Sequence, residues 1–363
     1  MHIVFAAGGT AGHIEPALNT ADALRRLDST VSISFIGSER GLESELVPAR
    51  GYPLITTAAV PFPRRVSADL LRMWPALNSS VRTARDHLRS TQARVVVGFG
   101  GYAAVPGYLA AWRQGVPLVI HEANATAGLA NKLGARLSSH TASVVPGVLP
   151  NSRRMGMPMR RAITSLDRQS ARKGARERWG IPSEARVLLV FGGSQGAARL
   201  NSALEQALPD LLSAGIFIVH SYGTRNQEPA AQPGYFPVPY IADMAEAYAV
   251  ADLALTRAGA MTCAELAAVG LPAAYVPLPI GNGEQRFNAL PVVSAGGGVL
   301  VSDEDLTPEW LRTVIPEILH DEQRLLSMSH AAAEFGDRDA DERMARWILS
   351  VGEMSGNRGN AAA

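Results

Sequence analysis

Residues 2–13 read HIVFAAGGTAGH, and residues 186–197 read RVLLVFGGSQGA. In each stretch a continuous apolar run passes directly into glycines, which is typical of a strand buried on both faces of a parallel sheet. A helical pattern follows each glycine segment, from Glu15 to Leu27 and from about Ala197 to Ser213. Each stretch therefore predicts a strand–loop–helix unit, and the chain begins that pattern twice.

Further apolar runs alternate with helical stretches around both glycine segments. Strands that alternate with helices predict a parallel sheet covered by helices on both faces. The expected fold class is therefore α/β, with two doubly wound, Rossmann-like parallel-sheet domains facing across a cleft. In open sheets of this kind, ligands bind beyond the carboxyl ends of the strands. The expected strands are 2–6, 31–37, 94–98, 116–121, 186–191, 216–221 and 252–256, and the later expected helices are 260–269, 284–294 and 308–319.

The length of the chain supports two domains, because 363 residues exceed the roughly 250–300 residues that one hydrophobic core usually serves. A segment from Pro146 to Pro182 is rich in proline, arginine and small residues and is expected to be the linker. The expected boundaries are residues 1–160 for an N-terminal domain and 161–338 for a C-terminal domain. Residues 339–352 are expected to form a helix that packs back on the N-terminal domain, and residues 353–363 a disordered tail.

Composition excludes several classes of protein. Hydrophobic residues make up 47% of the chain and charged residues 18%, which is globular, and a net charge of +1 gives no electrostatic case for nucleic acid. The single cysteine, Cys263, can form neither an internal disulfide nor a multi-cysteine metal site. No apolar run reaches about 18 residues, and the N-terminus lacks the basic segment of a signal peptide. We therefore expect a cytoplasmic protein whose membrane contact is peripheral.

The two glycine segments, 8–13 and 192–196, each follow an expected strand and open an expected helix. Glycines let a ligand approach the backbone closely, and free N–H groups at a helix start suit an anion. A dinucleotide site is the alternative, since Glu39 lies where a ribose-binding acid would fall. Neither segment fits G-x-G-x-x-G or the ending of a P-loop, and a plain structural turn is the other alternative.

Two later segments also lie between a strand and a helix. In the segment 257–265, Glu265 lies about one turn inside the helix, where its carboxylate can accept hydrogen bonds from a ribose diol; an acid that complements the helix dipole is the alternative. In the segment 279–288, Gln285 and Asn288 share one helical face, and their amides suit sugar hydroxyls; a solvated loop is the alternative.

Few residues are candidates for proton transfer or metal binding. His13 ends the first glycine segment, and a neutral imidazole there can take a hydroxyl proton at pH 7. His121, at the end of another strand, is the competing base, and a helix-start histidine that bonds the loop backbone is the structural alternative. The two D-x-D sequences, at 303–305 and 337–339, are better explained as approaches to helices, so we expect no metal and no cofactor. Cys263 is expected to be a packing residue.

Taken together, six segments of the chain resemble one family. The chain is similar to the MurG family, the N-acetylglucosaminyltransferases that convert lipid I to lipid II in bacterial peptidoglycan synthesis and have the GT-B fold. The resemblance runs from Met1 to about Ile348, and several motifs in one order make it more specific than any single loop. The matching segments are GGTAGHIEP (8–16), GFGGY (98–102), HEAN (121–124), GGSQGA (192–197), RAGAMT (257–262) and GEQR (283–286).

The resemblance implies inverting transfer of N-acetylglucosamine from UDP-N-acetylglucosamine to the 4-hydroxyl of lipid I, with no cofactor required. The C-terminal domain would hold UDP, and the N-terminal domain would hold the acceptor diphosphate and supply the base, His13. Implied partners are lipid I, the cytoplasmic leaflet of the cell membrane, and other cell-wall synthesis and division proteins. The implied contacts to UDP-N-acetylglucosamine come from Thr10, Ala11, Gly12, Asn124, Arg160, Ser194, Ile241, Ala260, Met261, Thr262, Cys263, Ala264, Glu265 and Gln285.

The resemblance leaves some questions open. Ala11 stands where many members have glycine, and Glu284-Gln285 stand where the family has paired glutamines, so Glu284 could not donate an amide hydrogen bond. Three other functions are alternatives. One is a paralogue that glycosylates another lipid or a natural product. The others are an isomerase similar to UDP-N-acetylglucosamine 2-epimerases, which share the two-domain architecture, and a catalytically silent sugar-nucleotide sensor.

An apolar stripe on an expected helix suits a membrane surface. Leu70, Leu71, Trp74, Leu77 and Val81 fall on one helical face. Such a stripe rimmed by arginine suits an anionic bilayer, and a helix buried on its own sheet is the alternative. Leu70, Leu71, Trp74 and Leu77 are therefore the expected membrane contacts. The surrounding arginines are Arg64, Arg65, Arg72, Arg82 and Arg85.

Overall fold

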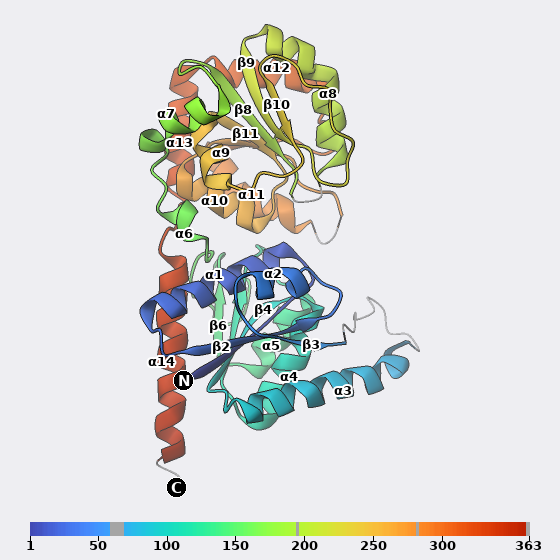
Figure 1. Cartoon of the computed structure of the whole chain (residues 1–363), viewed down its shortest axis with the longest axis vertical. Coiled ribbons are helices and arrows are strands. Elements are labelled where there is room, and N and C mark those ends of the chain that lie inside the picture. The colour runs from blue at the N-terminus through green and yellow to red at the C-terminus, as the bar shows by residue number, and fades with distance from the viewer. Residues whose placement is uncertain (59–68, 194–195, 281–282, 361–363) are drawn as a thin grey trace. The chain divides into compact units, whose positions relative to one another are not determined.

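The computed structural model describes residues 1–58, 69–193, 196–280 and 283–360 (Figure 1). The chain divides into two compact units, each with its own sheet and core. Unit 1 comprises Met1–Met159 and Asp339–Ala363, and unit 2 comprises Arg160–Arg338. The chain thus leaves unit 1 once, forms unit 2, and returns to unit 1 for its last helix.

Unit 1 is built on a parallel sheet, which has seven strands in the part of the chain that the structure describes, in the order β3-β2-β1-β4-β5-β6-β7. Successive residues of a strand point to opposite faces, and β1 is apolar on both. Ile3 and Phe5 join one core cluster, while Val4 and Ala6 join the other. The strands are β1 (His2–Ala7), β2 (Ser32–Ser38), β3 (Leu54–Thr57), β4 (Val95–Gly100), β5 (Leu118–Glu122), β6 (His140–Ser143) and β7 (Arg153–Arg154).

Helices cover both faces of this sheet (Figure 1). On one face, α1 packs against the C-terminal α14, and Arg26 donates to Asp341 at 2.6 Å. On the other face, α3 packs against α4. The helices of unit 1 are α1 (Ala11–Leu27), α2 (Glu43–Ala49), α3 (Asp69–Ser90), the 3₁₀ helix η1 (Tyr102–Ala104), α4 (Val105–Gln114), α5 (Leu129–Leu137) and α14 (Ala340–Asn360).

Unit 2 repeats the arrangement with a parallel sheet of six strands among the described residues, in the order β10-β9-β8-β11-β12-β13. Its central strand β8 again feeds two cores, with Val187 and Leu189 on one face and Leu188 and Val190 on the other. The strands are β8 (Arg186–Phe191), β9 (Ile216–Ser221), β10 (Tyr235–Val238), β11 (Leu253–Thr256), β12 (Ala273–Tyr275) and β13 (Gly298–Leu300). The helices are α6 (Arg161–Thr164), α7 (Arg168–Trp179), α8 (Ala198–Ser213), α9 (Met244–Val250), α10 (Ala260–Val269), α11 (Glu284–Ser294), α12 (Pro308–Leu319) and α13 (Glu322–Ala333).

The predicted linker, Pro146–Pro182, is wrong: the segment contains β7, α6 and α7 and contributes to both units. α7 is held to unit 2 by charge rather than by an apolar stripe. Its Arg176 is 2% exposed and donates to Asp252 at 3.0 Å, and Asp167 caps the helix through the N–H groups of Gln169 and Ser170. Because arginine supplies its buried contacts, hydrophobic periodicity could not reveal this helix.

The predicted elements agree best where apolar runs are long. The expected strands 186–191 and 216–221 coincide with β8 and β9, and the later expected helices coincide with α10, α11 and α12. β7 and β10, of two and four residues, are too short to show a period and were not predicted, whereas the four-residue β11 was predicted as 252–256. The predicted disordered tail is wrong for residues 353–360, because α14 continues to Asn360.

Candidate active site

The first glycine loop, Gly8–His13, joins the carboxyl end of β1 to α1. Gly9 has a φ of +91°, which only glycine adopts readily. A Cβ on Gly8 would lie 2.4 Å from Glu43 Oε1, and a Cβ on Gly101 would lie 2.0 Å from the backbone oxygen of Gly8. These glycines are therefore required by close packing of the loop against its own unit.

A buried carboxylate lies directly behind this loop. Glu43, at the start of α2, is fully buried. One of its oxygens accepts from the N–H of Gly9 at 2.9 Å, and the other accepts from the N–H of Ser38 at 2.8 Å and from the Ser38 hydroxyl at 2.5 Å. Glu43 is not among the residues predicted from the sequence, although it follows an expected strand and Gly41. The N–H of Gly9 is thus already hydrogen-bonded before any ligand binds, and a negative charge already lies behind the loop.

His13 lies at the start of α1 and is half-buried. Its Nδ1 is 3.0 Å from the hydroxyl of Thr10. Burial lowers the pKa of the His13 imidazole, while the charges of Glu122 and Glu43 and a backbone hydrogen bond with Gly8 partly oppose that shift. A lowered pKa keeps the imidazole neutral at pH 7, which is the form that a general base requires.

His121, the competing base, lies on β5 and is fully buried. Its Nε2 is 2.8 Å from the backbone oxygen of Gly156, and its ring lies 5.1 Å from that of Phe99. Its Nδ1 is buried and has no hydrogen-bond partner among the described residues. Burial also lowers the pKa of His121. The burial of its whole side chain favours a packing role for His121 over proton transfer.

The next residue, Glu122, organises the loop after β5. Its carboxylate is buried and accepts from the N–H of Asn124 at 2.9 Å, from the N–H of Gly128 at 3.1 Å and from Nδ2 of Asn131 at 2.9 Å. Asn131 in turn accepts from the hydroxyl of Tyr108 at 2.9 Å. This network fixes Asn124 at the carboxyl end of the sheet, where the fold places ligands.

The second glycine loop, Gly192–Gly196, joins β8 to α8. Gly193 and Gly196 have φ values of +94° and +77°, and a Cβ on Gly196 would lie 2.2 Å from the backbone oxygen of Tyr222. That same oxygen accepts from Asn201 Nδ2 at 2.9 Å, so the loop packs tightly on its neighbour. Ser194, the expected phosphate contact, lies outside the described residues.

The N-terminus of α10 is free of acids. Gly259 is its N-cap, no side chain caps the helix, and no acidic residue lies in its first turn. The N–H groups of the first turn therefore have no acidic side chain from their own turn beside them, which suits an anion. Cys263 is buried, and burial raises the pKa of its thiol to about 12, which favours the predicted packing role over a nucleophile.

Glu265 lies in the second turn of α10 and is half-buried. One carboxylate oxygen accepts from the hydroxyl of Tyr248 at 2.8 Å. Burial and the charge of Glu265 raise the pKa of Tyr248 well above its ordinary value, so Tyr248 stays protonated and donates. The charge of Arg160 also acts on Tyr248, which brings Arg160 and Glu265 into one region of unit 2.

Gln285 lies near the start of α10 although it belongs to α11. Its Oε1 accepts from the N–H groups of Ala258 at 3.1 Å and Leu278 at 3.0 Å. Asn288, one turn later, donates to the backbone oxygen of Ala258 at 3.3 Å. The two amides that share a face in the sequence therefore both contact the loop that leads into α10.

Family models match most of the chain. The glycosyltransferase family 28 N-terminal domain matches residues 3–143, and the glycosyltransferase family 28 C-terminal domain matches residues 187–344. The chain belongs to glycosyltransferase family 28. The N-terminal match lies within unit 1, and the C-terminal match covers most of unit 2 and the start of α14. Together with the two parallel sheets they confirm the predicted α/β, GT-B fold class.

Relatives of this family 28 enzyme are similar along their whole length. It is 56% identical to the UDP-N-acetylglucosamine–N-acetylmuramyl-(pentapeptide) pyrophosphoryl-undecaprenol N-acetylglucosamine transferase of Streptomyces avermitilis, covering 97% of this chain and 98% of that one. The protein of the same name in Mycolicibacterium smegmatis is 53% identical, with 96% and 94% covered. These relatives confirm the resemblance to the MurG family and identify the chain as a glycosyltransferase.

Solved structures agree. The crystal structure of MurG from Acinetobacter baumannii matches with a TM-score of 0.78 and 29% identity, covering 96% of this chain and 99% of that one. The UDP-GlcNAc 2-epimerase from Neisseria meningitidis matches with a TM-score of 0.65 but only 12% identity over 97% and 99%. That second likeness shows a shared fold alone, so the isomerase alternative gains nothing from it.

The sequence-predicted residues of this family 28 transferase divide between the two units. Unit 1 brings Thr10, Ala11, Gly12 and His13 to the end of β1, and Asn124 to the end of β5. Unit 2 holds Arg160, the buried Ile241, and Ala260, Met261, Thr262, Cys263, Ala264, Glu265 and Gln285. Among the described residues, no group of three or more His, Cys, Asp or Glu side chains could hold a metal ion.

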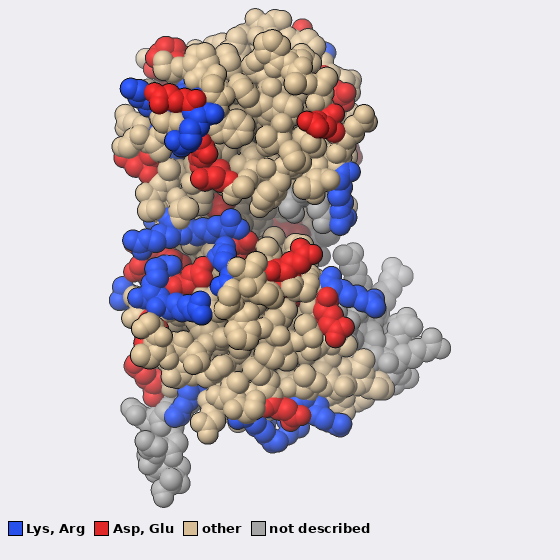
Figure 2. Space-filling view, in the orientation of Figure 1, with Lys and Arg blue, Asp and Glu red and all other residues tan. Residues whose placement is uncertain are grey.

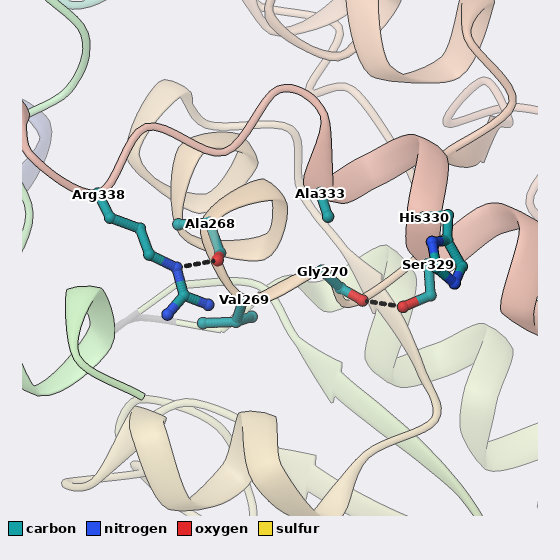
Figure 3. Close-up of a pocket in the computed structure, with 7 residues that line it drawn as sticks. All are labelled: Ala268, Val269, Gly270, Ser329, His330, Ala333 and Arg338. Atoms are coloured by element: carbon teal, nitrogen blue, oxygen red, sulfur yellow. Dashed lines mark hydrogen bonds between the residues drawn. The ribbon is translucent and has the colours of Figure 1, made fainter. Parts of the chain in front are cut away.

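A cavity of about 200 Å³ lies at the opposite, C-terminal end of α10 (Figure 3). Arg338 donates from Nε to the backbone oxygen of Ala268 at 2.8 Å, and Ser329 donates to that of Gly270 at 2.7 Å. Arg338 also donates to the backbone oxygen of Leu166 at 3.0 Å. The hydrogen bonds of Arg338, the last residue of unit 2, thus hold it to that unit. None of the residues that line the cavity belongs to a glycine loop.

The predicted apolar stripe on α3 is only partly on the surface. Trp74 is 62% exposed, whereas Leu77 packs partly against the core and Val81 is buried. The side chains of Leu70 and Leu71 lie outside the described residues. The C-terminal half of α3 therefore faces its own unit. No helix in the described part of the chain is long and apolar enough to cross a membrane.

Proposed function

We propose that this chain transfers N-acetylglucosamine from UDP-N-acetylglucosamine to the 4-hydroxyl of lipid I, with inversion, and so forms lipid II for peptidoglycan synthesis. The observation that carries the proposal is the 56% identity, over nearly the full length of both chains, to a transferase whose name describes this reaction. The two family 28 domains support the same class of reaction.

Unit 2 binds UDP in this proposal. The acid-free N-terminus of α10 receives the diphosphate, because its first-turn N–H groups and the helix dipole stabilise the charge that develops on the leaving group. Glu265 accepts the ribose hydroxyls, and the hydroxyl of Tyr248 holds its carboxylate by donating to one of its oxygens. Ser194 contacts the α-phosphate, and the backbone of Ile241 meets uracil. No metal is required.

Unit 1 supplies the chemistry on the acceptor. The 4-hydroxyl oxygen attacks the anomeric carbon as the bond from that carbon to UDP breaks, and His13 takes the hydroxyl proton. Thr10, Ala11 and Gly12 lie beside the reacting sugar, and Asn124 contacts its N-acetyl group. His13 is preferred to His121 because only His13 lies at the surface of its loop.

Lipid I is membrane-bound, so the enzyme works as a peripheral protein on the cytoplasmic leaflet. Trp74 on α3 and Trp112 on α4 are 62% and 57% exposed, and the two helices pack together. Arg82, Arg89 and Arg113 are exposed on the same helices, and basic side chains gather at the edge of unit 1 where these helices lie (Figure 2). Exposed tryptophans rimmed by arginine suit an anionic lipid surface.

A vesicle-binding measurement tests this surface. Trp74→Ala should bind anionic vesicles about tenfold more weakly, because the variant lacks an aromatic side chain that would insert into the lipid. Leu326→Ala, which removes an equally exposed apolar side chain from α13 of unit 2, is the matched control and should bind as the wild-type chain does. Unchanged vesicle binding by Trp74→Ala would remove α3 from the membrane surface.

One assay separates the candidate functions. Labelled UDP-N-acetylglucosamine is incubated with the enzyme alone, with a lipid I analogue, and with other lipid and natural-product acceptors. A labelled lipid product only in the presence of the analogue supports the proposal. Formation of an epimer without acceptor would identify an isomerase, binding with no reaction would identify a sensor, and transfer only to a different lipid or natural product would identify a paralogue. Any of the last three results would overturn the proposal.

A further inference from the structure

Two amide side chains on α11 hold one buried residue of the loop before α10. Gln285 Oε1 accepts from the N–H of Ala258, and Asn288 Nδ2 donates to the backbone oxygen of the same residue. Ala258 is 0% exposed, so neither of its backbone polar groups can bond to water. Buried backbone groups need partners, and both partners of Ala258 come from one face of α11.

The orientation of the Gln285 amide follows from its partners. The same atom that accepts from Ala258 also accepts from the N–H of Leu278 at 3.0 Å. Two N–H donors can converge only on an oxygen, so this atom cannot be the amide nitrogen. The NH₂ group therefore lies on the other side of the amide, where it makes no hydrogen bond within the described part of the chain.

These contacts join the loops that follow two neighbouring strands. Ala258 follows β11 and precedes Gly259, the N-cap of α10, whereas Leu278 follows β12. Since no side chain caps α10, the position of its first turn depends on how the preceding loop is held. Gln285 and Asn288 supply that support from a helix that lies much later in the chain.

We propose that Gln285 and Asn288 form an amide clamp on Ala258 that positions the N-terminus of α10 for the donor diphosphate, and that the clamp leaves Gln285 only N–H donors to offer the bound donor. The inference rests on the proposed function, since it takes α10 as the donor-binding helix. Asn288 is then a positioning residue that acts through the backbone of Ala258. The ligand atom over Gln285 must be an acceptor, such as a sugar hydroxyl oxygen or a phosphate oxygen.

Hydrogen exchange of the free protein tests the clamp without any ligand. Gln285→Ala should increase the exchange rates of the Ala258 and Leu278 amides about fivefold or more, because both lose their acceptor. Gln285→Glu should restore protection, since a carboxylate oxygen accepts the same two bonds. Gln206→Ala is the control, because Gln206 makes only exposed hydrogen bonds on α8. Exchange that is unchanged in Gln285→Ala, or equally fast in Gln285→Glu, would overturn the clamp.

Calorimetry with UDP and with UDP-N-acetylglucosamine tests its consequence. Asn288→Ala should weaken both ligands equally, about fivefold, because it displaces the helix that both diphosphates share. Gln285→Glu should lower the affinity for UDP-N-acetylglucosamine relative to UDP, because the donor group toward the sugar is lost while the loop is kept. UDP carries more negative charge than UDP-N-acetylglucosamine, so repulsion from the new carboxylate would weaken UDP more and could not produce this change.

Two results would overturn the inference. Asn288→Ala with wild-type affinity for UDP would show that the clamp does not position α10. An unchanged affinity ratio in Gln285→Glu would show that the Gln285 amide does not donate to the sugar. A wild-type chain that binds neither nucleotide would overturn the proposed function instead, and the exchange rates would still decide whether the clamp exists.

Discussion

The helix starts of α1 in unit 1 and α10 in unit 2 look alike in sequence and differ in charge. Each follows a strand and a glycine-containing loop, and neither has a side-chain cap. Behind the loop before α1 lies the buried carboxylate of Glu43. Behind the loop before α10 lies the largely buried guanidinium of Arg257, which pairs with Asp303.

The difference teaches that a glycine loop at a helix start is not by itself an anion site. A buried carboxylate disfavours a second negative charge nearby, whereas the Arg257–Asp303 ion pair adds no net negative charge near α10. The start of α10 therefore suits a leaving diphosphate. The start of α1 suits a neutral hydroxyl and a base that becomes positively charged when it takes the proton. Inverting glycosyl transfer needs one site of each kind.

The largest expected effect comes from removing the base at α1. His13→Ala should lower kcat about 100-fold to 10,000-fold, the usual contribution of general base catalysis, with little change in donor KM. Initial rates at saturating donor and lipid I analogue measure it. His330→Ala removes an exposed histidine from unit 2 and should leave kcat unchanged. If His13→Ala keeps more than about a tenth of the wild-type kcat, His13 is not the general base. The start of α1 would then not be the site of proton transfer.

A smaller effect is expected at α10, and it should appear in binding. Glu265→Ala should raise donor KM about tenfold or more, because charge-assisted hydrogen bonds to the ribose diol are lost. Tyr248→Phe removes only the hydroxyl that donates to Glu265 and should raise donor KM by less. Donor titrations at saturating acceptor separate KM from kcat. Unchanged donor KM in Glu265→Ala would make this residue a helix acid only.

The fold was predictable where the apolar pattern is continuous. β8 stands where the sequence places it because it is one continuous apolar run, and α10 to α12 do so because glycine or Thr307-Pro308 marks each helix start. α7 was missed because buried arginine replaces its apolar stripe. The charge behind each loop could not be predicted either. Glu43 contacts Gly9 over 34 residues of sequence, and only the folded backbone brings them together.

Individual site residues show the same limit. The sequence correctly predicted that Gln285 and Asn288 lie on one face of a helix, because their spacing of three residues is local. It could not tell that this face contacts Ala258, because that contact depends on the pairing of β11 with β12. The choice between His13 and His121 also needed burial, since both histidines end a strand or a loop in the sequence.

The smallest expected effect tests the charge behind α1 directly. Glu43→Gln removes a negative charge that raises the pKa of His13. The pKa of His13 should then fall further, and since the neutral imidazole is the active form, the acid limb of the kcat profile should move to lower pH. Glu122 remains in place as the other carboxylate acting on His13, and Glu39→Gln, which neutralises an exposed carboxylate near the same sheet edge, should leave the limb where it is.

The same variant decides whether the first glycine loop holds the acceptor diphosphate, as the family resemblance implies. If it does, loss of the Glu43 charge should lower the KM for a lipid I analogue, because repulsion between the carboxylate and the diphosphate disappears. If the loop holds only the hydroxyl and the base, acceptor KM should stay the same while the acid limb shifts. An acid limb that stays fixed or moves to higher pH would contradict the electrostatic contrast between α1 and α10, whatever happens to KM.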